Sequence, residues 1–124
     1  MAAIAADRLE RPSTAWHCCL EFFSVATRLP EEYRLAPEDA LRLIEQILAH
    51  LVVLDLPAAE RPELLRALAS ERVTGGRIYD HHIGAVAMSG GARVVVTENV
   101  RHFTHLARRG VRVLRAGEIL AEIE

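Results

Sequence analysis

Two isolated acids stand where a folded chain could use them for chemistry. Glu21 lies early in an expected helix, directly after a short apolar strand, and Asp80 opens a later helix after a polar turn. Open α/β sheets bind ligands at the carboxyl ends of their strands, so both carboxylates are candidates for a ligand crevice. Each also has a structural explanation, Glu21 as an exposed helix residue and Asp80 as a carboxylate that interacts with first-turn N–H groups.

A third candidate is the polar turn that follows the apolar run 94–96. Thr97, Glu98 and Asn99 come directly after this run, and Asn99 is the only asparagine in the chain. At a strand end these three residues are placed to present oxygens to the same crevice. The alternative is a capping sequence, in which Thr97 or Asn99 satisfies the N–H groups of the next helix.

The elements that must position these residues follow from the apolar periodicity. It predicts helices at 2–10, 17–27, 37–50, 57–71, 78–89, 100–108 and 116–123, and strands at 14–16, 51–55, 93–97 and 111–114. Helices and strands alternate, which favours an α/β fold with a parallel sheet covered by helices on both faces.

Composition limits the classes of protein that the chain can belong to. Its 124 residues, 51% hydrophobic and 26% charged, are typical of one globular domain, which we expect to span residues 1–124. No apolar run approaches the length of a membrane span. The first residues lack the basic start of a signal peptide, so we expect a cytoplasmic protein.

The charges are distributed unevenly along the chain. Residues 77–115 contain seven arginines against two acids, whereas the segments on either side are acidic and bring the net charge to -2. A basic block of this kind predicts a docking surface for a polyanion, with binding that weakens strongly as salt rises.

The segments 19–30, 77–87 and 96–103 together resemble the PIN domains of VapC-type toxin ribonucleases. In that family a Glu in an early helix, an Asp that opens a later helix, and a Thr-x-Asp/Asn turn followed by Phe occur in this order. Here they correspond to Glu21, Asp80 and the turn from Thr97 to Asn99, with Phe103 after it. The resemblance covers essentially the whole chain and implies a three-layer α/β/α PIN-like fold.

The resemblance also implies a reaction and roles for single residues. Glu21 and Asp80 would be metal-coordinating acids, Asn99 would take the position of the last acidic or amide residue, and Thr97 would orient the turn and the substrate phosphate. Mg²⁺ or Mn²⁺ suits such oxygen donors, and the ion polarises a phosphoryl group and activates a water molecule. The implied activity is metal-dependent endonucleolytic hydrolysis of RNA.

Partners are implied as well. RNA would be the substrate, and Arg77, Arg101 and His102 are the expected RNA contacts. A small antitoxin protein would cover or plug the acidic site. We also expect a homodimer or a hetero-complex, because loss of a central strand would leave apolar sheet edges exposed.

One family feature has no counterpart. PIN domains open with a strand that ends in Asp, the first metal ligand, and nothing in residues 1–14 matches it. Asp7 lies in an Ala-rich stretch that is similar to the family's second helix. We therefore expect an N-terminally truncated domain without the first strand and helix, and a poor nuclease. The alternative is a truncated or decayed, non-catalytic PIN-fold protein that binds RNA or a protein partner.

Overall fold

The computed structural model describes residues 3–5 and 12–123. In chain order the elements are β1 (Ala3–Ala5), β2 (Ser13–Ala15), α1 (Trp16–Ala26), α2 (Pro37–Leu48), β3 (Val52–Leu54), the 3₁₀ helix η1 (Ala58–Glu60), α3 (Arg61–Ser70), α4 (Arg77–Ser89), β4 (Val94–Val96), the 3₁₀ helix η2 (Val100–Arg109), β5 (Arg112–Leu114) and α5 (Ala116–Ile123). The predicted α/β class is confirmed, and every helix and strand predicted after residue 13 is present within a few residues of its expected bounds.

The five strands form one sheet in the order β3-β2-β1-β4-β5. β2 pairs with β3, and β4 with β5, in the parallel sense that the alternation of elements predicts. The central strand β1 runs antiparallel to both of its neighbours, β2 and β4. It follows that β2, β3, β4 and β5 all run in one direction, and their carboxyl ends lie along the same edge of the sheet.

The beginning of the chain corrects two predictions. A helix over 2–10 is wrong for Ala3–Ala5, which form β1, and the wholly parallel sheet is wrong because this central strand runs antiparallel to its neighbours. Residues 6–11, with Asp7, lie outside the described part of the chain. Without β1, backbone groups of β2 and β4 would lose hydrogen-bond partners, and this cost exceeds the weak helix preference of an Ala-rich stretch. The sheet is therefore mixed instead of wholly parallel.

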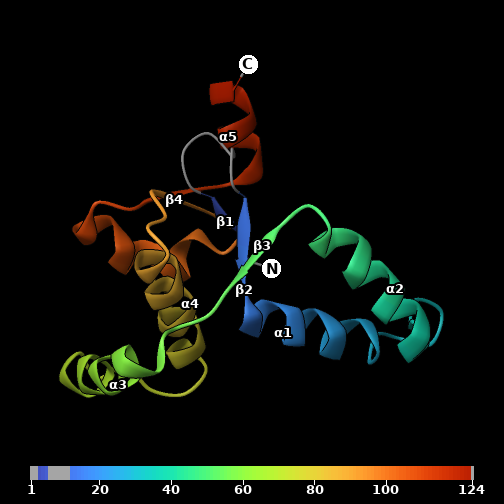
Figure 1. Cartoon of the computed structure of the whole chain (residues 1–124), viewed down its shortest axis with the longest axis horizontal. Coiled ribbons are helices and arrows are strands. Elements are labelled where there is room, and N and C mark those ends of the chain that lie inside the picture. Colours follow the sequence, from blue (N-terminus) through green and yellow to red (C-terminus); the bar gives the residue numbers. More distant parts are fainter. Residues whose placement is uncertain (1–2, 6–11, 124) are drawn as a thin grey trace.

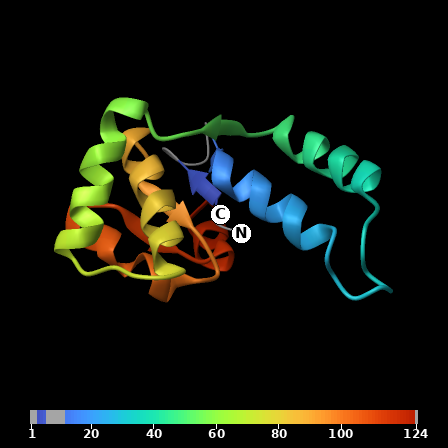
Figure 2. The same cartoon turned by 90° about the horizontal axis from the view of Figure 1, so that it is seen from below.

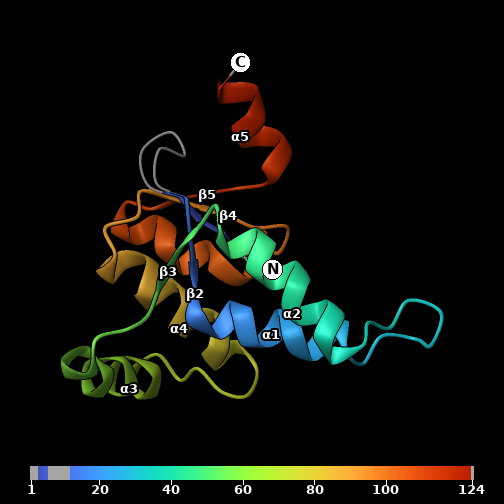
Figure 3. The ribbon, with the colours of Figure 1, turned by 45° about the vertical axis from the view of Figure 1, so that its right-hand side comes forward.

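Helices lie on both sides of the sheet. In Figures 1 and 2, α3, α4 and η2 gather on one side, whereas α1 and α2 form a hairpin that projects from the other. The view in Figure 3 shows α5 standing apart, beyond the end of β5. Within the described residues, no helix has the length and apolar character needed to cross a membrane.

The main core lies between the sheet and the α4–η2 side. Val95 of β4, Val86 of α4, and Phe103 and Leu106 of η2 are almost completely buried. Gly84 allows α4 and η2 to approach closely, because a Cβ there would lie 3.0 Å from Nε2 of His105 and 3.1 Å from a methyl carbon of Leu106. This contact holds the middle of η2 against the middle of α4, and the predicted site residues Asp80 and His102 lie nearer the beginnings of these two helices.

Candidate active site

The carboxyl edge of the sheet collects the predicted site residues. β2 leads directly into α1, which carries Glu21, and β4 leads into the turn that contains Thr97 and Asn99. α4 enters the same region at its first turn, which carries Asp80. Elements far apart in the sequence thus meet where an open α/β sheet binds its ligands.

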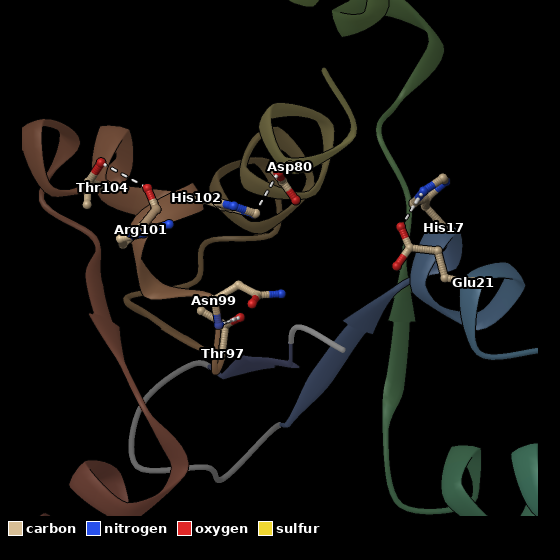
Figure 4. Close-up of polar contacts among 8 residues, drawn as sticks. All are labelled: His17, Glu21, Asp80, Thr97, Asn99, Arg101, His102 and Thr104. Carbon is tan, nitrogen blue, oxygen red and sulfur yellow. Dashed lines mark hydrogen bonds and ion pairs between the residues drawn. The ribbon is translucent and has the colours of Figure 1, made fainter. Parts of the chain in front are cut away.

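Asp80 faces the helix that follows β4. Its Oδ2 atom lies 3.2 Å from Nδ1 of His102 in η2, and the carboxylate is only partly exposed. The two residues come from different helices, so their contact fixes the first turn of α4 beside the turn after β4 (Figure 4). His102, expected as an RNA contact, is therefore also the nearest partner of a predicted metal ligand.

Thr97 shapes the turn in which Asn99 lies. The Thr97 side chain is buried, and its hydroxyl oxygen accepts a hydrogen bond of 3.0 Å from the backbone N–H of Asn99. The backbone N–H of Thr97 donates to the carbonyl of Leu114 in β5, at 2.9 Å. Asn99 is exposed, and its side chain makes no capping hydrogen bond to η2 among the described residues. The amide is therefore available to a ligand.

Glu21 is held by a residue on its own helix. Nε2 of His17 lies 2.8 Å from Oε1 of Glu21, one helical turn further on. The His17 ring stacks on the ring of Tyr79, with centroids 5.0 Å apart and planes 3° from parallel. Because Tyr79 precedes Asp80 in α4, this stack ties the Glu21 side of the site to the Asp80 side, and Figure 4 shows Glu21 across from Asp80 and Asn99. That the carboxylates of Glu21 and Asp80 lie close to each other stays a prediction.

The donors at this edge suit a divalent ion in kind but not in number. Carboxylate and amide oxygens are the ligands that Mg²⁺ and Mn²⁺ prefer. However, the described residues contain no group of three or more acidic, His or Cys side chains that could hold a metal ion. In the centre of the edge, β1 places Ala3 opposite Val96, and Ala3 carries no carboxylate. Among the described residues, Glu21, Asp80 and Asn99 are those that could hold such an ion at this edge.

Glu98 is directed away from the site. One of its carboxylate oxygens accepts a hydrogen bond of 3.4 Å from the backbone N–H of Ala116, at the start of α5. The other lies 4.0 Å from Nε of Arg115. This acid thus caps a helix and does not add a third carboxylate to Glu21 and Asp80.

The remaining predicted RNA contacts lie beside these residues. Arg77 is exposed at the beginning of α4, and Arg101 is exposed at the beginning of η2. The backbone carbonyl oxygen of Arg101 accepts a hydrogen bond of 3.4 Å from the hydroxyl of Thr104 (Figure 4). Their positions are compatible with phosphate binding, and their contact with RNA stays a prediction.

A groove of about 560 Å³ lies elsewhere, between α3, α4 and η2. Its lining includes Glu71, His81, His105 and Arg108, and none of the predicted catalytic residues. The rings of His81 and His105 stack 3.9 Å apart. Burial, and then the neighbouring His81, lower the pKa of His105 from 6.5 to about 4. The groove is separate from the candidate site because it lies against a different face of α4.

Sequence reasoning missed three residues at the site. His17, Tyr79 and His82 meet where α1 contacts α4, and the rings of His17 and His82 lie 5.9 Å apart, edge to face. Burial, and then the proximity of His17, lower the pKa of His82. The pairing of His17 with Glu21 has a visible signal, the spacing of four residues in a helix. The contacts of His17 with Tyr79 and His82, which lie on another helix, have no such signal in the sequence.

Comparisons with known proteins identify the family. The PIN domain family model matches residues 2–109. Ribonuclease VapC27 of Mycobacterium tuberculosis (strain ATCC 25618 / H37Rv) is 36% identical over 100 residues, which cover 81% of this chain and 71% of the relative. Ribonuclease VapC40 of Mycobacterium tuberculosis (strain CDC 1551 / Oshkosh) is 34% identical over 82 residues, 66% of this chain and 60% of the relative. The search of solved structures found no match. With the family model covering most of the chain and two VapC ribonucleases among its relatives, this protein belongs to the PIN-domain family and is of the VapC type.

Proposed function

We propose that this chain is an endoribonuclease of the PIN type that hydrolyses RNA phosphodiesters slowly. The observation that carries the proposal is the meeting of α1, α4 and the turn after β4 at the carboxyl edge of the sheet, linked by the contacts of His17 with Tyr79 and of His102 with Asp80. The names of the two relatives, both ribonucleases, support RNA as the substrate.

In this proposal Glu21 and Asp80 are the residues that hold Mg²⁺ or Mn²⁺, and Asn99 adds an amide oxygen. When bound, such an ion would supply Lewis-acid polarisation of the phosphoryl group. Thr97 fixes the turn that presents Asn99. Two acids and an amide hold Mg²⁺ weakly, because this ion gives up its water reluctantly. Both acids also contact histidines that an ion would have to displace or share. These features account for slow cleavage.

The proposed partners use the acidic site and further surfaces. Arg77 and Arg101 are exposed at the beginnings of α4 and η2, the helices that carry Asp80 and His102, and they would bind the phosphates of RNA. A small antitoxin protein would cover the acidic site. A second copy of the chain would cover apolar side chains that are exposed on the hairpin and on the edge strand β3: Trp16, Leu20, Val25, Leu41, Leu43, Val52 and Val53. Apolar exposure on this scale is typical of a binding surface.

The test is cleavage of a mixed RNA pool with Mn²⁺ and with EDTA. We expect slow, Mn²⁺-dependent cleavage, and a fall of about 100-fold or more in Asp80→Asn and in Glu21→Gln, because each loses a ligand of the ion. Asp39→Asn is the matched control, since Asp39 is exposed on α2 and pairs with Arg42. Cleavage that persists in both variants, or that proceeds in EDTA, would contradict the proposal.

A second function is favoured by one specific observation. The described residues contain no group of three potential metal ligands, and this is the arrangement that a non-catalytic PIN-fold protein would have. Such a protein would bind RNA or a protein partner without cleaving it. RNA that is retained by the chain and stays intact with Mn²⁺ would favour this second function over the first.

A further inference from the structure

Tyr79 presents an aromatic ring in an unusual setting. It lies in the first turn of α4, directly before Asp80, and the residue is 54% exposed. The imidazole of His17 stacks on one face of the ring, with centroids 5.0 Å apart and planes 3° from parallel. Tyr79 thus combines a stacked neighbour on one face with a large exposed surface.

The ring beneath Tyr79 is itself fixed. His17 is mostly buried, its Nε2 atom lies 2.8 Å from Oε1 of Glu21, and its edge packs against His82 at 5.9 Å. Tyr79 is therefore backed by a side chain that is held on two sides. A ligand that stacks on a ring that is already held in place loses little binding free energy to the ordering of that ring, so the surface is pre-organised.

The surroundings of Tyr79 suit a nucleic acid. Arg77 is exposed two residues before it, and Asp80 follows it with a contact to His102. In the sequence Tyr79 thus stands between an exposed arginine, which can bind a phosphate, and the carboxylate of the candidate site. Unpaired RNA bases are commonly held by stacking on aromatic side chains, next to arginines that bind the backbone.

We propose that Tyr79, supported by His17, is a stacking platform for one unpaired base of single-stranded RNA. This inference rests on the proposed function, because it assumes that RNA crosses the site of Glu21 and Asp80. It adds to that function a fixed point on the protein for one base beside the phosphodiester to be cleaved. A base in duplex RNA cannot use the platform, since both of its faces are stacked already.

The experiment measures binding without cleavage. A labelled single-stranded RNA of about 12 nucleotides is titrated with the protein in EDTA, together with a set of copies that each lack one base. We expect Tyr79→Leu to bind about 5-fold or more weakly, and Tyr79→Phe to bind within about twofold of the unchanged chain, because the ring is kept. Tyr33→Leu is the matched control: Tyr33 is 66% exposed and lies in the turn beyond the end of α1.

The missing-base series separates stacking from a structural role. Removal of the base at one position of the RNA should weaken binding to the unchanged chain by about the same factor as Tyr79→Leu. Removal of the same base should not weaken binding to Tyr79→Leu any further. Equal binding by Tyr79→Leu and the unchanged chain would overturn the platform and leave Tyr79 as a contact for a protein partner. Thermal unfolding shows whether Tyr79→Leu is folded. If it is not, the unchanged chain alone decides: the platform is overturned if removal of no single base from the RNA weakens binding.

Failure of this inference can be told apart from failure of the proposed function. Cleavage that needs Asp80 but is insensitive to Tyr79 would contradict the platform alone. Base-specific loss of binding without any cleavage would contradict the nuclease alone and keep the platform. A chain that binds no single-stranded RNA contradicts both.

Discussion

At the scale of single residues, the sequence identified side chains by type and position but not their partners. Glu21, Asp80 and Asn99 could be named because each follows a strand or opens a helix. The contact of Asp80 with His102 could not be found, since it depends on how closely α4 and η2 pack. Glu98, which its position at a strand end also made a candidate for the crevice, instead contacts the start of α5.

A histidine outside the site gives a residue-scale prediction on pH. The pKa of His105 is lowered from 6.5 to about 4, first by burial and then by His81. Between these values the unfolded chain binds a proton that the folded chain does not, so this contribution to stability is present above pH 6.5 and is lost as the pH falls towards 4. His105→Gln should therefore lose less stability than the unchanged chain over this range.

The measurement for His105 is urea unfolding at about pH 7.5 and about pH 4.5, compared between the unchanged chain and the variant. His50→Gln is the control, because His50 is exposed at the end of α2. A fall in the free energy of unfolding that is equally large with and without His105 would show that other groups cause it.

At the scale of elements, local patterns predicted most of the helices and strands and failed at β1. A parallel strand and an antiparallel strand can fill the same gap in a sheet, and a three-residue strand leaves almost no periodicity to read. Residues 3–5 join the sheet because β2 and β4 offer backbone hydrogen bonds on both sides. These partners lie elsewhere in the sequence, so the residues of the segment alone could not predict the strand.

The placement of β1 predicts the effect of Ile4→Pro. In β1, Ile4 is opposite Ser13 on one side and Val95 on the other, so proline would remove a ladder hydrogen bond from a central strand. We expect a clear loss of stability, on the order of 1–3 kcal/mol for a buried unsatisfied group. In a helix over 2–10, by contrast, proline at residue 4 would fall in the first turn and be tolerated.

Thermal and urea unfolding of Ile4→Pro and of Ile4→Val provide the check. The valine variant keeps the N–H group and a strand-forming side chain, so its stability should stay close to that of the unchanged chain. A proline variant as stable as the valine variant would show that residues 3–5 do not pair as the central strand.

At the scale of the whole molecule, the PIN fold is present, and its described residues contain no group of three acidic, His or Cys side chains that could hold a metal ion. Our proposal places the site at the carboxyl edge of the mixed sheet, where Asp80 contacts His102. The middle of the carboxyl edge, however, is occupied by a strand that runs in reverse and places Ala3 beside the end of β4. A strand entering in the parallel sense and ending in Asp would bring its carboxylate to this edge, and would displace β1.

The most direct test compares RNA cleavage by this chain and by a version extended upstream with a strand that ends in Asp. Both are incubated with a mixed RNA pool and Mg²⁺ or Mn²⁺, and Asp80→Asn is made in each. We predict much faster, Asp80-dependent cleavage by the extended chain, because a third carboxylate completes the donor set around the ion. Equal, Asp80-dependent cleavage by both would contradict this, and would mean that an acid already present, Asp7 or Glu98, completes the site.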